Sequence, residues 1–447
     1  MSSRDIAYKI LIDIEVGKNY SNLAINNHLK NPNISNIDKG LITEIVYGVI
    51  ENEKYIDHMI NKVSKIKVRK MSNIVKIMLR IGVYQMMFLD SVKDYAAINE
   101  TVNIVKRLDK KSSGFVNAVL RNISRDKDNI KVVNAKGIDY LSIKYSYNKW
   151  IVGRFVKEYG YEFTEELLEA LSEKSKLYVR VNKTKSKEFN SFDEYINFII
   201  DSLGKDGVEA KKVDVVKEAL LVKNFKNIEK NELFKNGYIS IQDVSSMLVA
   251  EVLNPKKNSK VLDVCAAPGG KSTHIAEYME NTGEVVSQDI YEHKIKLIDT
   301  YAKRLGLNNL KTNLADAEVL DENYIEKFDY VVCDVPCSGM GIVRRKPEIK
   351  YKKEEDVVEL SKIQSKILRN SSKYVKKGGI LIYSTCTLFK EENMDIIENF
   401  LNDNKDFTLD IIDNVMIDKE TQKDGYLKIL PNKHNMDGFF ICRMKKI

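Results

Sequence analysis

The sequence predicts a multidomain protein in which an all-α bundle is followed by a small α+β module and then by an α/β domain with a Rossmann-like, doubly wound sheet. Three observations predict this fold class. Up to about residue 130, apolar residues recur at helical spacing and Pro32 is the only proline. From 131 to 236, helical and strand-like patterns are mixed. From about Tyr238 onward, short hydrophobic strands alternate with helices, which is typical of a parallel sheet.

The first part of the chain, residues 1–130, is expected to form a compact bundle of several helices. Its apolar faces include the sets Tyr8, Ile10, Leu11 and Ile14; Ile42, Ile45, Val46 and Val49; and Ile74, Ile77, Met78 and Ile81. This part contains no cysteine and two histidines, so no catalytic set is expected in it. Basic residues cluster at 62–70 and 106–111. Solvated helix faces are the ordinary interpretation of such clusters, and contact with nucleic-acid phosphates is the alternative.

The middle part, residues 131–236, is expected to be a small α+β module. Helical patterns cover 151–159, 164–171 and 192–203, and strand-like patterns cover 177–181 and short pieces around Val208, Val213 and Leu220. The third expected domain, residues 237–447, contains the strand patterns 261–264, 283–288, 310–314, 328–334 and 379–383. In an open parallel sheet, groups at the carboxyl ends of the strands face one shared crevice.

The composition limits the classes of function. The 447 residues include 72 basic and 64 acidic side chains, and this excess permits nucleic acid as a partner without requiring it. Five cysteines without a C-x-x-C pair argue against a disulfide framework and against zinc, so we expect no metal site. Neither a signal-like N-terminus nor an apolar run of the roughly 18–20 residues that span a bilayer is found, so a reducing cytoplasm is expected.

A glycine turn follows the first predicted strand of the third domain, at Pro268-Gly269-Gly270-Lys271. A P-loop would require glycine where Cys265 stands, so that motif is excluded. A dinucleotide fingerprint requires three spaced glycines, and two are present. What remains is a short turn at which the backbone can approach a ligand closely, because glycine has no side chain.

Acidic residues follow the next two predicted strands. Asp289 lies twenty residues after Gly269, a separation that suits hydrogen bonding to a ribose diol, and Asp316 could flank the base of the same nucleoside. For either aspartate alone, a turn or a helix cap is an equally good interpretation. Ligand-type groups at three successive strand ends favour a bound nucleoside without a pyrophosphate, and S-adenosylmethionine is such a ligand.

Two cysteines lie just past strand ends. Cys337 follows the strand 328–334 and Cys386 follows the strand 379–383. A thiolate is a strong nucleophile, and a helix predicted to begin near Lys390 would lower the pKa of Cys386. A buried, inert thiol is the ordinary interpretation of any one cysteine, but two at adjacent strand ends favour chemistry. Cys265, Cys333 and Cys442 are interpreted as structural, the first beside the glycine turn and the others inside strands.

These motifs resemble the RNA cytosine-5 methyltransferases of the NOL/NOP/Sun group. The resemblance is carried by the segments 265–271, 334–339, 384–386, 341–350, 237–246 and 437–440. It implies a class I methyltransferase fold for the third domain. The helical part is similar to the NusB antiterminator fold, and this fusion is similar to bacterial small-subunit ribosomal RNA cytosine-5 methyltransferases over essentially the whole chain. Tyr351 stands where the family usually has tryptophan, and we expect it to keep the aromatic role.

The resemblance implies a cofactor and a site. S-adenosyl-L-methionine would be held by Cys265, Ala266, Ala267, Pro268, Gly269, Gly270, Lys271, Asp289, Asp316 and Asp334. The catalytic residues would be Cys386, Cys337, Asp334 and Lys271. Cys386 would attack cytosine C6, Cys337 would assist its release, and Asp334 would contact the cytosine edge beside Lys271. The target base would have to be unstacked to reach the crevice.

The implied partner is small-subunit ribosomal RNA, with no DNA and no membrane, and we expect a monomer. Arg344, Arg345 and Lys350 form a basic run close after Cys337, which favours contact with RNA phosphates over a merely solvated surface. A DNA cytosine methyltransferase is one alternative, but it would use the Pro-Cys thiol and would not need Cys386. A non-catalytic RNA-binding or assembly factor is the other, and the intact glycine turn and Cys386 argue against it.

Overall fold

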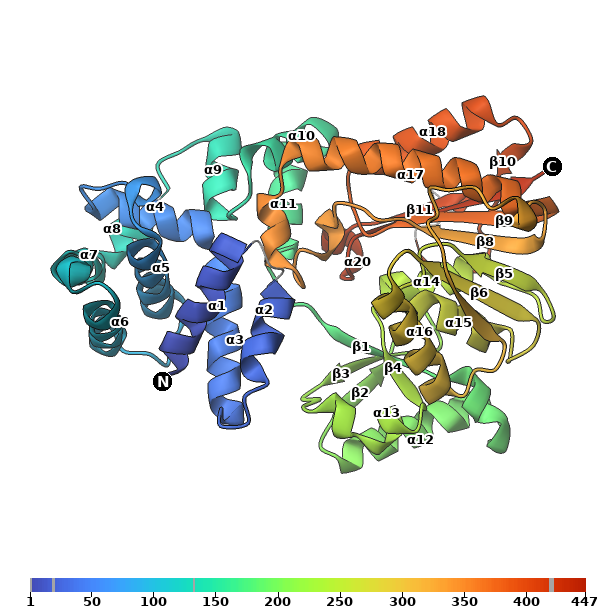
Figure 1. Cartoon of the computed structure of the whole chain (residues 1–447), viewed down its shortest axis with the longest axis horizontal. Coiled ribbons are helices and arrows are strands. Elements are labelled where there is room, and N and C mark those ends of the chain that lie inside the picture. Colours follow the sequence, from blue (N-terminus) through green and yellow to red (C-terminus); the bar gives the residue numbers. More distant parts are fainter. Residues whose placement is uncertain (1, 18–20, 132, 418–421) are drawn as a thin grey trace. The chain divides into compact units, whose positions relative to one another are not determined.

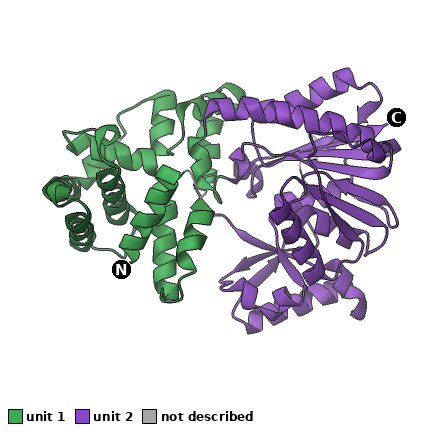
Figure 2. Cartoon of the chain, viewed as in Figure 1, with its two compact units in different colours: residues 1–172, 343–352 green, residues 173–342, 353–447 purple. Residues whose placement is uncertain are grey.

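The computed structural model describes residues 2–17, 21–131, 133–417 and 422–447 (Figure 1). The chain divides into two compact units (Figure 2). The first comprises Met1–Ser172 together with Val343–Lys352, and the second comprises Glu173–Ile342 together with Lys353–Ile447. The sequence-based boundaries at 130 and 236 do not coincide with this division, and the three-domain assignment stays a prediction.

The first unit is helical, as predicted (Figure 1). Its helices are α1 (Ser3–Gly17), α2 (Ser21–Leu29), α3 (Asn36–Glu51), α4 (Glu53–Val63), α5 (Asn73–Phe88), α6 (Asp94–Leu108), α7 (Ser113–Arg125), α8 (Lys127–Lys131), α9 (Gly137–Lys144), α10 (Lys149–Tyr159) and α11 (Tyr161–Ala170). Ser35 and Ser72 start α3 and α5, because each side-chain oxygen accepts a hydrogen bond from a first-turn backbone N–H. The apolar faces predicted from helical spacing meet in one core that contains Ile10, Ile45 and Met78.

A distant segment, Val343–Lys352, is part of this helical unit. Its 3₁₀ turn Pro347–Tyr351 is held by hydrogen bonds along its length. Ser21 Oγ donates to Glu348 Oε2 over 2.8 Å, and the Tyr351 hydroxyl donates to the Ile50 carbonyl over 2.7 Å. Tyr351 also packs against the bundle core, which fits the aromatic role expected for it. Residues far apart in sequence therefore build one bundle.

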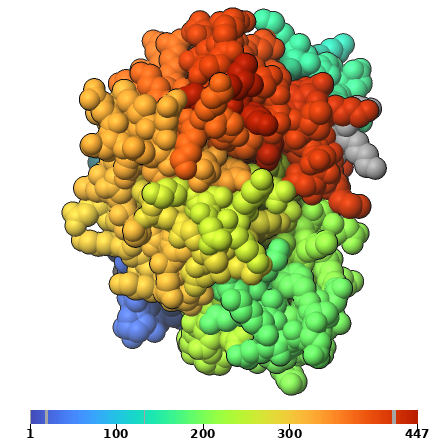
Figure 3. Space-filling view, turned by 90° about the vertical axis from the view of Figure 1, so that its right-hand side faces the viewer, coloured from blue at the N-terminus to red at the C-terminus, as the bar shows by residue number. Residues whose placement is uncertain are grey.

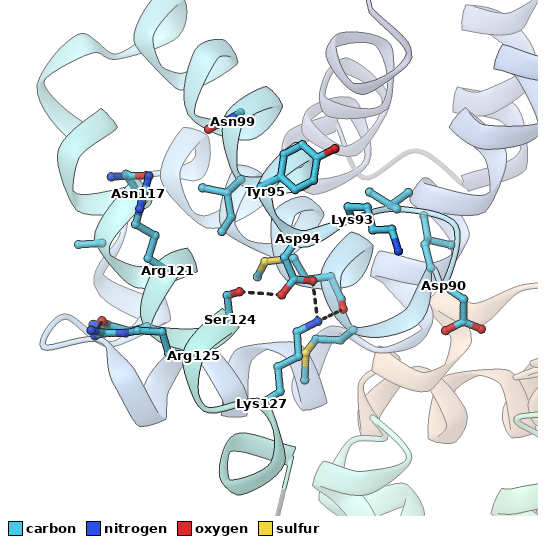
Figure 4. A pocket seen from close by; sticks show the side chains of 17 residues that line it. Asp90, Lys93, Asp94, Tyr95, Asn99, Asn117, Arg121, Ser124, Arg125 and Lys127 are labelled. Atoms are coloured by element: carbon cyan, nitrogen blue, oxygen red, sulfur yellow. Dashed lines mark hydrogen bonds and ion pairs between the residues drawn. The ribbon is translucent and has the colours of Figure 1, made fainter.

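A hollow of about 990 Å³ lies on the helical unit between the end of α5, the start of α6 and α7 (Figure 4). Its polar groups largely satisfy one another. Asp94 accepts hydrogen bonds from Ser124 Oγ and Lys127 Nζ, as Figure 4 shows. Arg121 and Arg125 each donate to an asparagine side chain of their own helix. The hollow is therefore lined by charges of both signs, some of which are paired with each other within it.

The second unit begins with a small α+β module. Its antiparallel sheet has the order β2-β3-β1-β4, formed by β1 (Leu177–Val181), β2 (Glu209–Lys212), β3 (Ala219–Lys223) and β4 (Ile239–Ile241). α12 (Phe192–Lys205) buries Tyr195 and Ile199 against the sheet. In Figure 3 the module, in green, borders the yellow-green residues of the α/β part.

The remainder is an α/β layer structure around a sheet of order β10-β12-β9-β8-β5-β6-β7, with β11 paired to β12. Its strands are β5 (Lys260–Asp263), β6 (Glu284–Asp289), β7 (Leu310–Leu314), β8 (Phe328–Asp334), β9 (Val375–Thr385), β10 (Phe407–Leu409), β11 (Tyr426–Ile429) and β12 (Phe439–Lys446). The five strands predicted from sequence, β5 to β9, are parallel to one another. The sheet as a whole is mixed, because β12 adds antiparallel to β9 and itself pairs antiparallel with β10 and β11.

Helices cover both faces of this sheet (Figure 1). α14 (Val244–Leu253), α15 (Gly270–Tyr278) and α16 (Glu292–Leu305) pack on the face that contains Val332, and α17 (Glu354–Tyr374) and α18 (Met394–Asp403) pack on the face that contains Val331. Successive side chains of β8 point to opposite faces, which is why its near-continuous hydrophobic run serves two cores. Cys333 and Cys442 are buried inside β8 and β12, as expected. Across the described ranges, no helix combines the length and apolar character needed to cross a bilayer.

Candidate active site

Three neighbouring strands deliver the site residues to one edge of the sheet. β8 lies between β5 and β9 and is parallel to both, so the carboxyl ends of all three meet. β5 leads into the glycine turn, β8 ends at Asp334, and β9 ends at Thr385, directly before Cys386. The order β9-β8-β5 therefore sets two thiols and the glycine turn side by side, with Asp334 between them.

The two cysteine thiols are in contact. The Sγ atoms of Cys337 and Cys386 lie 3.2 Å apart, and both cysteines are reduced and partly buried. The hydrogen bond with Cys386, followed by burial, raises the pKa of the Cys337 thiol well above its ordinary value. Either sulfur can donate in this contact, so the two thiols can share a proton.

A lysine–aspartate pair lies beside the thiols. Lys271 Nζ is 2.7 Å from Asp334 Oδ2, and Ser384 Oγ donates to Asp334 Oδ1 over 2.8 Å. Burial lowers the pKa of Lys271, but the Asp334 carboxylate outweighs burial and Cys386 adds to the same effect, so the net pKa lies above its ordinary value. Lys271 therefore stays positively charged close to Cys386.

The glycine turn is shaped by contact with α16. Gly269 has a φ of +104°, and a Cβ atom there would lie 3.3 Å from Ile298. Gly270 then begins α15, whose first turn presents backbone N–H groups. Beneath the turn, Asp263 Oδ2 accepts a hydrogen bond from Ser272 Oγ, while its buried Oδ1 has no hydrogen-bond partner among the described residues. Burial is the main cause that raises the pKa of Asp263 to about 7.

Of the two aspartates proposed to face a nucleoside, Asp289 is the last residue of β6 and Asp316 follows β7. Asp289 is 7% exposed, and its Oδ1 accepts a hydrogen bond from the Tyr291 backbone and lies 3.6 Å from Lys294 Nζ. Asp316 accepts one from the Glu318 backbone. Each aspartate makes a local turn contact, which is compatible both with a turn or cap and with a nucleoside contact. In the described part of the chain, the second carboxylate oxygen of each has no partner, which leaves an acceptor for a ligand hydroxyl.

These residues fit S-adenosylmethionine. A nearly buried aspartate with one unused acceptor suits a ribose diol, and the turn at Gly269 lets the backbone approach a ligand. Ala266 and Ala267 line the turn with small side chains, and Pro268 is exposed there. Burial raises the pKa of the Cys265 thiol well above its ordinary value, which agrees with a structural role beside the turn. No cluster of three or more metal-type ligands occurs among the residues that the structure covers.

The prediction that Lys350 contacts RNA phosphates is wrong for this structure. Lys350 is 1% exposed, and its Nζ donates to the carbonyls of Glu51 and Tyr145 over 3.2 Å each. These carbonyls lie at the ends of α3 and α9, where backbone acceptors lack helical partners and the helix dipole attracts a cation. Arg344 and Arg345 are partly buried in the same segment, and their contact with RNA stays a prediction.

Two features near the thiols were not found from the sequence. The helix expected at Lys390 is a 3₁₀ turn, Lys390–Glu392, and α18 begins only at Met394. Glu392, which looks exposed in the charged run Lys390-Glu391-Glu392, is fully buried. It accepts hydrogen bonds from Ser338, the neighbour of Cys337. The positions of Ser338 and Thr387 directly after the two cysteines were a signal, but nothing local in the sequence reveals that Ser338 bonds to Glu392 or that the two hydroxyls meet.

Comparisons with known proteins show the family. A family model described as 16S rRNA methyltransferase RsmB/F matches residues 250–445. Models described as the NusB family and as the ferredoxin-like domain of RsmF/B-like methyltransferases match 1–125 and 147–229. The chain is 40% identical to the probable ribosomal RNA small subunit methyltransferase B of Bacillus subtilis, over 100% of this chain and 99% of that protein. It is 30% identical to the corresponding protein of Synechocystis, over the full length of both.

Solved structures show the same architecture. The protein PH0851 is 26% identical with a TM-score of 0.80, over 100% of this chain and 99% of that one. A methyltransferase homolog protein from Pyrococcus horikoshii is 28% identical with a TM-score of 0.58, over 69% of this chain and 98% of that one. The chain therefore belongs to the RsmB/F family of 16S rRNA methyltransferases.

Proposed function

We propose that this protein transfers a methyl group from S-adenosyl-L-methionine to C5 of a cytidine in 16S ribosomal RNA, through a covalent bond between Cys386 and C6. Family membership makes it an S-adenosylmethionine-dependent rRNA methyltransferase. The observation that supports C5 of cytosine is the pair of thiols, whose Sγ atoms lie 3.2 Å apart beside the Lys271–Asp334 pair. Methylation of an amino or hydroxyl group would need neither thiol.

The thiol pair answers a chemical difficulty. Cytosine C5 is too weak a nucleophile to take a methyl group unaided. Addition of the Cys386 sulfur to C6 forms the S–C6 bond and converts the ring to an enamine, whose C5 can attack an electrophile. S-adenosylmethionine supplies that electrophile, a methyl group on a sulfonium centre. Loss of the C5 proton then allows the S–C6 bond to break, which returns Cys386 as a thiolate and restores the aromatic ring.

The pKa of Cys337 supports this division of roles. The hydrogen bond with Cys386 and burial raise the pKa of Cys337, which disfavours Cys337 as the attacking thiolate and supports Cys386 as the nucleophile. Once Cys386 is bonded to C6, its sulfur is a poorer acceptor and the largest cause of the raised Cys337 pKa disappears. Cys337 can then release its proton to water and accept the proton from C5.

Asp334 and Lys271 are placed to hold the cytosine edge. The Asp334 carboxylate is fixed by Lys271 Nζ and by Ser384 Oγ, so it is oriented before any base arrives. It can accept a hydrogen bond from the exocyclic amino group. Lys271 can stabilise the negative charge that develops on the ring as sulfur adds to C6. The free carboxylate oxygens of Asp289 and Asp316 are proposed to bind the cofactor nucleoside.

We further propose that the helical unit contributes affinity for ribosomal RNA. Because the enzyme would act where ribosomal RNA is found, we also propose a cytoplasmic location. Exposed cations of the 62–70 and 106–111 clusters, such as Lys65, Arg69, Lys106 and Lys111, are available for phosphates. A non-catalytic assembly factor would use this surface too, but it would not need the thiol pair.

The test is direct. Incubating the protein with tritiated S-adenosylmethionine and 16S ribosomal RNA from a strain that lacks it should label the RNA. Bisulfite sequencing should then show one protected cytidine, because 5-methylcytosine resists deamination. Label without bisulfite protection would move the reaction from C5, and no label with free RNA or with small subunits would support the assembly factor.

A further inference from the structure

Glu392 is a fully buried carboxylate with no cationic partner among the residues that the structure describes. It ends the 3₁₀ turn Lys390–Glu392, close after Cys386. Burying a charge without compensation is costly, so such a group is tolerated only where several donors meet it. The identity of those donors shows what Glu392 holds in place.

Three donors converge on the carboxylate. Ser338 N and Gln364 Nε2 donate to Oε1 over 2.8 and 2.9 Å, and Ser338 Oγ donates to Oε2. Gln364 Nε2 also donates to the Pro336 carbonyl over 2.9 Å. Pro336 and Ser338 flank Cys337, so both neighbours of this cysteine are fixed by Glu392 or by its partner Gln364.

The next residue, Asn393, does the same for the second thiol. Thr385 Oγ1 donates to Asn393 Oδ1 over 2.5 Å, and Asn393 Nδ2 donates to the Thr387 carbonyl over 3.1 Å. Thr385 and Thr387 flank Cys386. Asn393 is 3% exposed, so these hydrogen bonds are shielded from water.

A direct bond joins the two loops. Ser338 Oγ and Thr387 Oγ1, on the residues that follow the two cysteines, lie 2.7 Å apart. The Tyr383 hydroxyl donates to the Glu392 carbonyl over 2.6 Å and so ties the dipeptide to β9, the strand that leads to Cys386. Glu392 and Asn393 together thus help to fix the residues on either side of each of the two cysteines.

We propose that Glu392 is a positioning residue which, together with Asn393, sets the distance between the Cys337 and Cys386 sulfurs. It makes no hydrogen bond to either thiol in the described part of the chain and acts through Gln364 and through Ser338, which bonds to Thr387. Its charge also contributes to the raised pKa of Cys337, after the hydrogen bond with Cys386 and burial. Its catalytic consequence rests on the proposed roles of the two cysteines, but the geometry is testable without any methyl transfer.

The variants follow from the donor pattern. In Glu392→Gln, the amide oxygen can keep the two N–H donors, and the amide nitrogen can donate to Ser338 Oγ, whose own proton turns to Thr387. Glu392→Ala removes every acceptor and leaves the two N–H donors unpaired. Glu398→Gln, on the exposed face of α18, is the matched control for loss of a carboxylate. Ser338→Ala removes the hydroxyl that links the two loops and donates to Glu392, but it keeps the Ser338 N–H and Gln364 donors, so it is a milder second variant should Glu392→Ala fail to fold.

The first measurement reports sulfur spacing. Phenylarsine oxide binds two thiols at once only when they lie a few ångström apart, so the wild type should bind one equivalent that disappears in Cys337→Ala and in Cys386→Ala. Glu392→Ala or Ser338→Ala should weaken this binding by at least about tenfold, because chelation depends on the effective concentration of the second thiol. Glu392→Gln and Glu398→Gln should bind as the wild type does. Unchanged binding in Glu392→Ala and Ser338→Ala would overturn the proposal.

The second measurement separates positioning from folding. Glu392→Ala should retain cofactor affinity and RNA affinity while its methyl-transfer rate falls by about 100-fold, since small displacements of reacting groups are costly. Glu392→Gln should restore most of the rate. Loss of arsenical binding with an unchanged rate would leave the geometry established and would instead contradict the proposed roles of the thiols. A fall in cofactor affinity that matches the fall in rate would reduce Glu392 to a general structural residue and overturn its positioning role.

Discussion

Arg180 and Glu277 form a bidentate ion pair that is completely buried in the second unit. Arg180 Nε and Nη2 donate to the two carboxylate oxygens of Glu277 over 3.0 and 2.8 Å, and Arg180 Nη1 donates to the Gly270 carbonyl over 2.8 Å. Arg180 belongs to β1 of the α+β module, whereas Gly270 begins the helix after the glycine turn. The module therefore holds the proposed cofactor turn through one guanidinium group.

Removing this guanidinium should affect both stability and cofactor binding. Arg180→Ala leaves the Glu277 carboxylate buried without its partner, so the free energy of unfolding should fall by about 3–5 kcal/mol. Denaturant unfolding measures this, and calorimetry should show weaker S-adenosylmethionine binding in the folded fraction. Lys212→Met, at a position on β2 of the same sheet, breaks an exposed pair with Asp193 of α12 and should cost less than about 1 kcal/mol. Equal losses in the two variants would contradict a special role for Arg180.

The two thiols should behave differently when each is removed. Cys386→Ala should abolish methyl transfer and still bind the cofactor, because no nucleophile remains. Cys337→Ala should form the protein–RNA adduct and methylate C5, but the adduct should fail to resolve. A species stable to denaturing electrophoresis should therefore accumulate with Cys337→Ala.

The double variant Cys337→Ala, Cys386→Ala is the control, and it should form no adduct. A DNA-type mechanism reverses the pattern, since Cys337 would then attack. An adduct that accumulates only with Cys386→Ala would exchange the two roles.

Asp289 should contribute directly to cofactor affinity. Asp289→Ala removes the nearly buried carboxylate whose second oxygen is proposed to accept a ribose hydroxyl, so binding should weaken by about 1–3 kcal/mol. Isothermal titration calorimetry with S-adenosylmethionine measures the change. Asp299→Ala, on α16 with its carboxylate bonded to Thr312, is a control that should bind normally. If both variants bind equally well, the ribose contact lies elsewhere.

The buried Lys350 amine should make the free energy of unfolding depend on pH in the alkaline range. Burial lowers the pKa of Lys350 to about 8 in the folded protein, below its ordinary value of 10.5. Between these values the unfolded chain binds more protons than the folded one, so the free energy of unfolding should rise with pH, by up to about 3 kcal/mol. Below pH 8, where Lys350 is charged in the folded protein, the full destabilisation caused by burying this charge is present.

Comparing variants isolates this group from other titrations. Lys350→Met should lose the rise between pH 8 and 10.5, as followed by denaturant unfolding, whereas Lys346→Met, at an exposed position of the same segment, should keep it. Parallel stability profiles for the wild type and Lys350→Met would show that the buried amine does not titrate in this range.

RNA affinity should depend on exposed cations of the helical unit. Deleting residues 1–130 is a poor test, because Lys350 and Tyr351 would lose their partners in the bundle. Substituting Lys65, Arg69 and Lys70 by alanine leaves the core intact, since all three are exposed. Each lost phosphate contact should reduce the slope of log affinity against log salt by about one. A slope and affinity equal to those of the wild type would assign these residues to an ordinary solvated surface.

The sequence by itself determined the fold class and the five parallel strands that follow one another along the chain. Hydrophobic runs such as 328–334 and 379–383 are local signals, and alternation with helices restricts their pairing to a parallel sheet. The same alternation predicted that Cys337, Cys386 and the glycine turn follow strand ends. It could not reveal the antiparallel β12, because no connecting helix or turn signal specifies on which edge, or in which direction, a final strand adds.

Only the tertiary structure decided the environment of charged side chains. Lys350 and Glu392 both occur in charged runs that look exposed, yet each is buried by residues distant in sequence. Helix-end carbonyls of the bundle receive the Lys350 ammonium, and Ser338 with Gln364 receives the Glu392 carboxylate. Local periodicity reports which face of an element is apolar, but the free energy of burying a charge depends on donors and acceptors that only the folded chain brings together.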